Sequence, residues 1–490
     1  MNKKIRTRFA PSPTGFLHIG GLRTALFNYL IAKSGQGETI LRIEDTDQKR
    51  EVEGAVDKLN QILEWAGINF EEGPTQGGDH GPYIQSQRKE IYSQYAQELL
   101  KTGQAYYCFC DSDRLEKMRQ EQKQKGLPPR YDGKCRDLNS EEVNKKIEQG
   151  ENYVIRQKMP LEGEVVASDL LRGEIRFPAG DLEDHVLIKS DGMPTYQFAS
   201  VVDDHLMEIS HVVRGEEWLP SFPKNILLYQ AFGWTIPEFI HLPVILDKDG
   251  GKLSKRKNNV AVEEYQKQGY LPQALINFMA LLGWHPKDEQ ETLTLEEILE
   301  RFNPRDIGTS PATFDIDKLD YFNGYHIRQL DEETLLDQCL PFLKDNLNQA
   351  SAAHKTERDF LKKVVRMEQE RLKKLSEIGD LTRFLFVEQP EYDKELLLWK
   401  KLEYRDVIRN LNSLYQLLEK LPEEQWRTEV LEEKIINHIR EKEEKVGNFL
   451  WPMRAALTGQ EKSPGPFEVA DALGKEESLK RIQSAIDKTD

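Results

Sequence analysis

The fold is decided by residues 9–21, which read Phe9-Ala10-Pro11-Ser12-Pro13-Thr14-Gly15-Phe16-Leu17-His18-Ile19-Gly20-Gly21. A strand-like run over 5–10 leads into this stretch, and residues 18–33 carry apolar side chains at helical spacing. The two prolines stiffen the turn between them, and Gly15 permits a backbone φ that other residues resist. His18 is therefore expected at the start of a helix, where backbone N–H groups and the helix dipole favour a phosphate.

The pattern of strand and helix continues beyond this helix. A second strand is predicted over 40–44, and Asp45-Thr46-Asp47 predicts the cap of a helix that runs to about Trp65. Buried strands return over 209–213 and 241–246. This alternation predicts an α/β fold with a parallel sheet and crossover helices.

A second motif follows the last of these strands. Residues 250–256 read GGKLSKR, so that Lys252 and Lys255 follow a pair of glycines. Two cations there can meet the charge that develops on an α-phosphate and on departing pyrophosphate. Neither motif is a P-loop. We interpret the two as halves of a clamp around a nucleoside triphosphate; a structural histidine and a basic hairpin tip are the alternatives.

Composition narrows the functional class further. The chain has 490 residues, enough for two to four domains, and a formal net charge of −16. That charge argues against non-specific coating of nucleic acid, but not against binding one folded RNA along a local basic face. The basic first ten residues lead into no apolar run, and no apolar stretch approaches a bilayer span. We therefore expect a cytoplasmic protein without a membrane partner.

Three of the four cysteines are close in sequence. Cys108 and Cys110 form one short pair of potential ligands, and Cys135 and Asp137 form another. Two such pairs suit a tetrahedral zinc ion, whose role would be structural because it lies outside the triphosphate clamp. The alternative is a set of metal-free cysteines, and four cysteines in this length are no disulfide scaffold.

On these motifs the chain resembles the class I aminoacyl-tRNA synthetases, and within them the bacterial-type glutamyl branch. Residues 9–21 resemble the HIGH region, with Gly21 in place of the final histidine, and 252–256 resemble the KMSKS region. The turn sequence 10–15 favours the glutamyl over the glutaminyl branch. Similar stretches run along nearly the whole chain, at 40–47, 194–207, 213–218, 310–323, 453–459 and 473–475.

The resemblance implies a four-part organisation. Residues 1–104 would be the first half of a Rossmann-type catalytic domain, and 105–190 an inserted subdomain that binds the acceptor end of tRNA. Residues 191–325 would supply the second half of the catalytic domain, the lysine loop and a stem-contact region. Residues 326–490 would form an all-α anticodon-binding region, as their Leu, Lys and Glu spacing also indicates.

The resemblance also implies ATP-dependent activation of L-glutamate and its transfer to the 3′ end of tRNA-Glu, releasing AMP and diphosphate. We expect His18, Lys252 and Lys255 to be catalytic and Mg²⁺ to bridge phosphate oxygens. A monomer is expected. The residues expected to bind ATP are Pro11, Ser12, Gly15, His18, Ile19, Gly20 and Gly21 in the first motif, and Lys252, Leu253, Ser254, Lys255 and Arg256 in the second.

Glutamate itself needs cations for two carboxylates and an anion for its ammonium. Arg8 and Arg214, at strand ends, suit bidentate carboxylate contacts, and Glu44 suits the ammonium. The resemblance assigns the glutamate site to these positions, and the expected set is Arg8, Ala10, Ser12, Glu44, Tyr196 and Arg214. An ordinary ion pair is the alternative for Arg214 and Glu44. Glutamine would leave a buried arginine without its partner, at a cost of roughly 2–5 kcal/mol.

Several alternatives stay open on the sequence alone. A relative that charges a modified tRNA base would lack the helical C-terminal half, and a non-catalytic descendant would have lost part of the clamp. A third is an adenylyl-transferring enzyme unrelated to tRNA, against which the C-terminal similarities argue. Charging of tRNA-Gln as well is undecided. The basic residues of 358–373 are either phosphate contacts or a solvated helix face.

Overall fold

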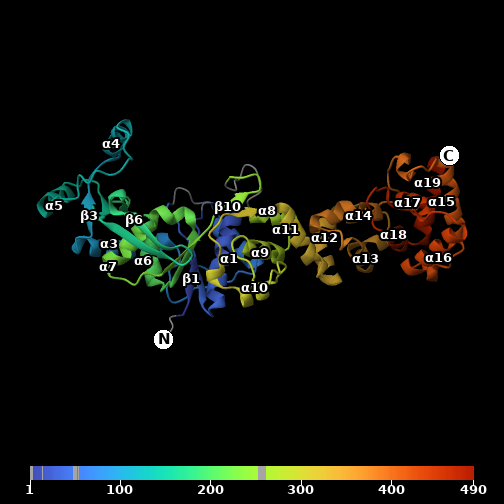
Figure 1. Cartoon of the computed structure of the whole chain (residues 1–490), viewed down its shortest axis with the longest axis horizontal. Helices are drawn as coiled ribbons and strands as arrows, with labels where there is room; N and C mark the ends of the chain where they lie inside the picture. Colours follow the sequence, from blue (N-terminus) through green and yellow to red (C-terminus); the bar gives the residue numbers. More distant parts are fainter. Residues whose placement is uncertain (1–3, 14, 48–51, 53, 252–260, 490) are drawn as a thin grey trace. The chain divides into compact units, whose positions relative to one another are not determined.

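The computed structural model describes residues 4–13, 15–47, 52, 54–251 and 261–489. The chain divides into two compact units. The first comprises Met1–Tyr265 and Leu275–Ile316, and the second comprises Gln266–Ala274 and Asp317–Asp490. Figure 1 colours them in sequence order, with the strand-bearing first unit from blue to yellow and the helices of the second toward red.

The first unit contains the strands. They are β1 (Arg6–Phe9), β2 (Glu38–Leu41), β3 (Ala105–Cys108), β4 (Val154–Gln157), β5 (Glu164–Asp169), β6 (Gly173–Pro178), β7 (Val186–Ile188), β8 (His211–Gly215), β9 (Glu238–Leu242), β10 (Ile245–Asp247) and β11 (Ala312–Phe314). The helices from this part of the sequence are α1 (Ile19–Ser34), α2 (Ala55–Trp65), α3 (Lys89–Lys101), α4 (Ser112–Gln124), α5 (Ser140–Glu148), α6 (Tyr196–Leu206), α7 (Phe222–Phe232), α8 (Val262–Lys267), α9 (Pro272–Leu281) and α10 (Leu295–Arg301).

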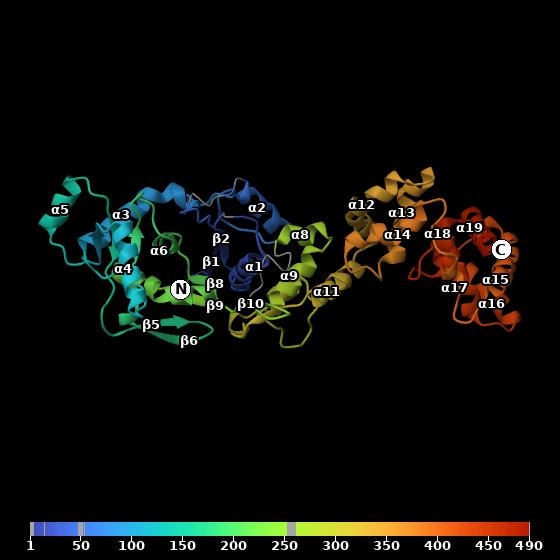
Figure 2. The same cartoon turned by 90° about the horizontal axis from the view of Figure 1, so that it is seen from above.

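Parallel pairing at the centre of this unit confirms the predicted fold class. β1 pairs with β2, and β8 pairs with β9, both in parallel. The backbone N–H of Ser210, just before β8, donates to the carbonyl of Arg6 at 3.0 Å, so β8 lies beside β1, as Figure 2 also shows. β9 continues to β5 and then β6, in the order β6-β5-β9-β8. Helix α1 makes the crossover between β1 and β2.

Helix α1 forms where the apolar spacing predicts it. Its Leu22, Leu26 and Leu30 are fully buried, and burial of each such side chain contributes roughly 1.5–3 kcal/mol. The helix ends at Ser34, and the chain turns back into β2 through Gly37. A Cβ atom at Gly37 would lie 2.1 Å from the carbonyl oxygen of Ile5, so only glycine fits this approach to the neighbouring chain.

Two local expectations are corrected by the structure. Helix α2 begins at Ala55 and is not capped by Asp45, whose carboxylate instead accepts a hydrogen bond from the backbone N–H of Ser86 at 2.7 Å. The single strand expected over 241–246 is two strands, β9 and β10, because Pro243 lies between them and cannot donate to a ladder.

The segment 105–190 contributes to two sheets. β3, β4 and β7 form an antiparallel sheet with α4 and α5 nearby in sequence. β5 pairs with β6 as a hairpin, but Asp169 at its end also pairs in parallel with Phe239 of β9. Part of the segment therefore belongs to the same sheet as β8. The four-part division stays a prediction.

The second unit is helical, as predicted for the C-terminal region. No strand occurs among its described residues. It holds most of α11 (Ile316–Arg328), then α12 (Glu332–Asn348), α13 (Arg358–Glu368), α14 (Ile378–Phe386), α15 (Tyr404–Glu419), α16 (Thr428–Glu441), α17 (Val446–Thr458), α18 (Pro466–Leu473) and α19 (Lys475–Thr489). Within the part of the chain that the structure describes, no helix is both long and apolar enough to cross a membrane.

Candidate active site

A cavity of about 690 Å³ opens at the carboxyl ends of β1 and β8, the edge where open α/β sheets bind ligands. Its lining includes every described residue that we expected to bind ATP or glutamate: Arg8, Ala10, Pro11, Ser12, Gly15, His18, Ile19, Gly20, Gly21, Glu44, Tyr196 and Arg214. Lys252, Leu253, Ser254, Lys255 and Arg256 lie outside the described residues. The structure thus gathers side chains from four separate stretches of sequence around one space.

His18 is the N-cap of α1. Its Nδ1 accepts a hydrogen bond from the backbone N–H of Gly21 at 2.9 Å, so the neutral ring carries its proton on Nε2. A Cβ atom at Gly20 would lie 3.2 Å from the ring, and one at Gly21 would lie 2.7 Å from the side chain of Leu17. A side chain at position 20 would therefore crowd the imidazole, whereas one at position 21 would crowd Leu17.

The described residues on both sides of the lysine motif fix where that segment leaves and returns. On the near side, the N–H of Asp247 donates to the carbonyl of Gly251 at 2.9 Å. On the far side, Ala261 forms an antiparallel bridge with His18, and the N–H of Val262 donates to the carbonyl of Leu17 at 3.0 Å. The first described residue after the lysine motif, Ala261, therefore lies next to the histidine.

A buried charge network underlies the opposite part of the cavity. Arg8 Nε donates to Asp204 at 2.9 Å, and Arg42 donates to the same carboxylate oxygen at 2.7 Å. Arg42 also donates to Glu44 at 2.9 Å. Burial opposes the charge of Arg8, but Asp204 raises its pKa above the ordinary value. Neither Arg42 nor Asp204 is predicted from the sequence, although charged residues inside otherwise apolar segments are a signal of this kind of network.

Glu44 carries a carboxyl whose pKa lies near neutral pH. Glu44 is only 4% exposed, and this burial raises the pKa of its carboxyl to about 7, although Arg42 and Arg8 oppose the shift. A cation placed against Glu44 would favour the carboxylate further.

Arg214 is held in a different way from Arg8. It is buried, its Nε donates to Nε2 of His241 at 3.0 Å, and its second terminal nitrogen donates to the amide oxygen of Asn225 at 3.0 Å. Among the residues that the structure describes, no carboxylate lies within ion-pair distance of Arg214. Burial lowers the pKa of Arg214, with the hydroxyl of Tyr196 opposing that shift. A buried guanidinium with neutral partners is a site for an anion.

Tyr196 completes this wall of the cavity. It is the first residue of α6, and its ring packs against Trp218 with centroids 4.4 Å apart. Burial raises the pKa of Tyr196 to about 12, and Glu44 adds to the shift. The hydroxyl therefore stays protonated and can donate or accept a hydrogen bond.

Outside the cavity, Cys108, Cys110 and Cys135 come together as predicted. Their sulfur atoms all lie within 4.8 Å of one another. The hydroxyl of Tyr131 lies 3.3 Å from the sulfur of Cys108 and 3.6 Å from that of Cys110. Its hydrogen bond from the N–H of Cys135, at 3.0 Å, holds it there. Three sulfur atoms and one phenolic oxygen thus lie close together.

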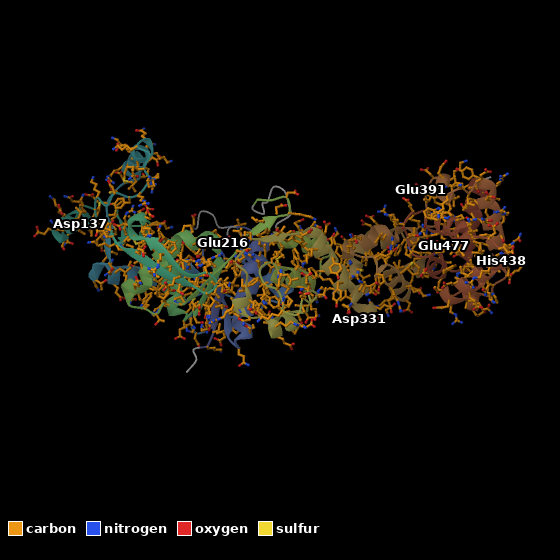
Figure 3. The ribbon with its side chains drawn as sticks, viewed as in Figure 1. Asp137, Glu216, Asp331, Glu391, His438 and Glu477 are labelled. Carbon is orange, nitrogen blue, oxygen red and sulfur yellow. The ribbon has the colours of Figure 1, made fainter. Side chains whose placement is uncertain are left out.

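The structure does not bring Asp137 to these sulfurs. Its side chain, labelled in Figure 3, is 87% exposed and lies 3.8 Å from the ammonium of Lys158. Two residues after Cys135, the chain directs this carboxylate to solvent. The spacing of the sequence identified the sulfur donors but not the direction of the fourth side chain.

The basic residues of 358–373 are largely neutralised within the second unit. Arg358 pairs with Glu333 and Asp337, and Lys362 pairs with Glu333 as well. Further along, Lys363 pairs with Asp471 at 3.4 Å and Arg371 with Glu368 at 2.8 Å. These ion pairs favour the alternative of a solvated helix face over a bare phosphate-binding stripe.

Comparisons with known proteins agree with this geometry. Residues 4–321 match the family described as tRNA synthetases class I (E and Q), catalytic domain, and residues 334–486 match an anticodon binding domain.

Two curated relatives and one solved structure are similar over nearly their whole lengths. A glutamate–tRNA ligase of Clostridium botulinum strain Hall is 46% identical over 100% of this chain and 99% of the relative. A glutamate–tRNA ligase of Clostridium tetani strain Massachusetts is 44% identical over 99% of this chain and 98% of the relative. The crystal structure of a glutamate tRNA ligase from Elizabethkingia meningosepticum, in complex with its amino acid, superposes with a TM-score of 0.90 at 36% identity, covering 99% of each chain.

Proposed function

This chain belongs to the glutamate–tRNA ligases, within the class I tRNA synthetases for glutamate and glutamine, and from that membership we propose how its residues carry out the reaction. It activates glutamate with ATP and joins it to tRNA. The observation that carries the proposal is that one cavity combines a helix start bearing His18 with two buried arginines and a carboxylate, a match for a triphosphate beside glutamate.

The chemistry takes two steps. The α-carboxylate of glutamate attacks the α-phosphorus of ATP in line, which forms glutamyl-adenylate and releases pyrophosphate. A ribose hydroxyl at the 3′ end of tRNA-Glu then attacks the adenylate carbonyl, and AMP leaves. No side-chain nucleophile takes part, so positioning and charge stabilisation carry the rate.

On the ATP side, His18 and the two lysines meet the phosphates. The N–H on Nε2 of His18 donates to a phosphate oxygen, and Lys252 and Lys255 offset the charge that builds up on the α-phosphate and on pyrophosphate. The bridge between Ala261 and His18 supports this arrangement, because it places the first described residue after the lysine motif beside the histidine. Mg²⁺ enters with the phosphates of ATP, which are its preferred oxygen ligands.

On the glutamate side, different charged residues of the cavity bind different groups of the substrate. Arg214 takes the side-chain carboxylate, because among the described residues it has only neutral hydrogen-bond partners. Arg8 already shares Asp204 with Arg42 and contributes positive potential near the carboxylates. Glu44 takes the ammonium, and the Tyr196 hydroxyl adds a hydrogen bond.

The role of Glu44 predicts a pH dependence. Between pH 6 and 8 glutamate keeps its ammonium and both carboxylates ionised, whereas Glu44 changes from mostly protonated to mostly ionised around its pKa of about 7. Only the carboxylate can receive the ammonium, so the KM for glutamate should fall about tenfold from pH 6 to 8. Initial rates of ATP–pyrophosphate exchange at several pH values measure this. Glu44→Gln should have a high KM that hardly changes with pH, and an equally steep dependence in this variant would contradict the assignment.

The test of the function as a whole is ATP–pyrophosphate exchange with glutamate or glutamine, with and without tRNA-Glu. We expect exchange with glutamate and not with glutamine, and the family resemblance leads us to expect that tRNA is needed for it. Exchange that responds to glutamine and not to glutamate would overturn the substrate assignment.

The second unit is proposed to bind the anticodon and the segment 105–190 to bind the acceptor end. The match of 334–486 to an anticodon binding domain supports the former and disfavours a relative that charges a modified tRNA base. We propose that the protein acts as a monomer. Because charged tRNA is consumed in translation, we propose a cytoplasmic location.

The cysteine cluster is proposed to hold a structural zinc ion. Cys108, Cys110 and Cys135 would supply three sulfurs, a donor set that zinc prefers, and the hydroxyl of Tyr131, 3.3 Å from the sulfur of Cys108, would be the fourth donor. The ion would tie the turn after β3 to the loop that carries Cys135, and it takes no part in the reaction.

Metal analysis tests this site directly. The purified protein should contain about one zinc per chain, and Cys135→Ser should lose most of it and unfold at a lower temperature. Asp137→Ala and Cys339→Ser should keep the metal, because one side chain points to solvent and the other is buried in α12. Zinc-free wild-type protein of normal stability would rule the site out. Loss of zinc in Asp137→Ala, but not in Tyr131→Phe, would restore Asp137 as the ligand.

A further inference from the structure

Behind Arg214 lies a line of buried polar side chains that no proposed substrate touches. Arg214 Nε donates to Nε2 of His241 at 3.0 Å, and Nδ1 of His241 lies 2.8 Å from a carboxylate oxygen of Asp169. The side chains of His241 and Asp169 are both fully buried. The line runs from the wall of the cavity through β9 to the end of β5.

The hydrogen bonds fix which nitrogen of His241 carries the proton. Arg214 has no acceptor atom, so Nε2 must accept from it and Nδ1 must donate to Asp169. Asp169 is itself held, because the same oxygen accepts the backbone N–H of His241 at 2.9 Å. Its other oxygen accepts those of Leu171 and Arg172, each at 3.0 Å. An ionised carboxylate is the group that can accept all four bonds.

Aromatic rings enclose the arrangement. Phe222 packs against the imidazole at a centroid distance of 4.8 Å, and the guanidinium carbon of Arg214 lies 5.3 Å from the ring centroid of Phe239. Asn225 holds the second terminal nitrogen of Arg214. With Nε and one terminal N–H engaged, the remaining N–H groups of the fork are those available to a ligand in the cavity.

We propose that Asp169 and His241 are positioning residues that orient the Arg214 guanidinium toward the side-chain carboxylate of glutamate and so set the preference for glutamate over glutamine. The inference rests on the proposed role of Arg214. The hydrogen bonds to Asp169 and Arg214 select the tautomer of His241 that carries its proton on Nδ1. In the other tautomer, the N–H on Nε2 would face the N–H on Nε of Arg214, and two donors cannot form a hydrogen bond. Arg214 would then turn away, and its match to a planar carboxylate would be lost.

Three variants test the inference in ATP–pyrophosphate exchange. His241→Ala should raise the KM for glutamate about tenfold or more, leave the KM for ATP within about twofold, and lower the glutamate-to-glutamine preference by a similar factor. His241→Gln, whose amide oxygen can accept from Arg214, should recover most of this loss. Asp169→Asn, which presents an amide donor to Nδ1, should resemble His241→Ala although the ring is still present. His211→Ala on the neighbouring strand β8 should change neither KM.

A spectroscopic measurement separates positioning from general destabilisation. With ¹⁵N-labelled histidine, the signal that disappears in His241→Ala should be that of an Nδ1-protonated ring in the wild type, and it should become Nε2-protonated in Asp169→Asn. An unchanged tautomer in that variant would overturn the inference. So would equal rises in KM for ATP and glutamate in His241→Ala, which would mean loss of structure.

The outcomes also separate this inference from the proposed function on which it rests. If Arg214→Ala raises the KM for glutamate but His241→Ala does not, the positioning role is wrong and the role of Arg214 stands. If Arg214→Ala has no effect on glutamate, the proposed role of Arg214 fails first, and the inference fails with it.

Discussion

Replacement of Lys255 by alanine is expected to slow formation of glutamyl-adenylate by about 10²–10³-fold, the usual loss when one fixed donor to transition-state charge is removed. The reason is that charge builds on the α-phosphate and on pyrophosphate only as the bond between them breaks. A cation that interacts with this charge lowers the activation free energy without strengthening the binding of the substrates in the ground state. Single-turnover measurement of adenylate formation, with saturating ATP and glutamate, reads this step alone.

Lys248→Ala is the matched control for that variant. Lys248 lies on the same connection after β10, but its ammonium pairs with Asp315 at 3.1 Å. Its loss should leave the rate within about twofold. The affinity of Lys255→Ala for tRNA-Glu should equal that of the wild type. A parallel fall in tRNA binding and in rate would mean that the variant is misfolded, and an unchanged rate would remove Lys255 from the catalytic set.

Replacement of Arg214 by alanine should have the largest effect on glutamate recognition. A buried carboxylate that loses its charged partner costs roughly 2–5 kcal/mol, which corresponds to a rise of about 30- to several thousand-fold in the KM for glutamate. Glutamine carries no such charge, so the discrimination between the two substrates should fall by a comparable factor. Rates of ATP–pyrophosphate exchange, measured across concentrations of each amino acid, give the KM for glutamate and the discrimination between glutamate and glutamine.

Arg176→Ala controls for the general loss of positive charge. Arg176 lies on β6 in the same sheet, is well exposed, and pairs with Glu164 and Glu174. This variant should retain the wild-type KM for glutamate. A small rise in the KM of Arg214→Ala, with discrimination against glutamine intact, would show that another group reads the side-chain carboxylate.

The central fold could be predicted because its signals are local. The apolar spacing of α1 and the strand runs on either side of it act over a few residues, and they specify a crossover between parallel strands. The start of α2 could not be predicted in this way. Asp45 is a residue type that often caps helices, but its carboxylate instead accepts a hydrogen bond from the backbone N–H of Ser86, some forty residues away. A tertiary hydrogen bond of this kind leaves no trace in the local sequence.

The same distinction holds in the cavity. Arg8, Glu44 and Arg214 could be identified because the carboxyl ends of parallel strands converge, so charged residues at those ends meet. Asp204 could not, because its partnership with Arg8 joins residues 196 positions apart. His241 is read from the sequence as one polar residue in a buried strand, and only the packing of β5 against β9 shows what it contacts.

The start of α1 restricts what the histidine there can do. Because the amide of Gly21 occupies Nδ1, the neutral ring offers the cavity a nitrogen that gives a hydrogen and cannot take one away. A substrate whose nucleophile had to be deprotonated in place would find no base in this ring. In the first step the attacking group must therefore arrive already ionised, as the α-carboxylate of glutamate does in neutral water, and the ribose hydroxyl of the second step must lose its proton to a group other than this ring.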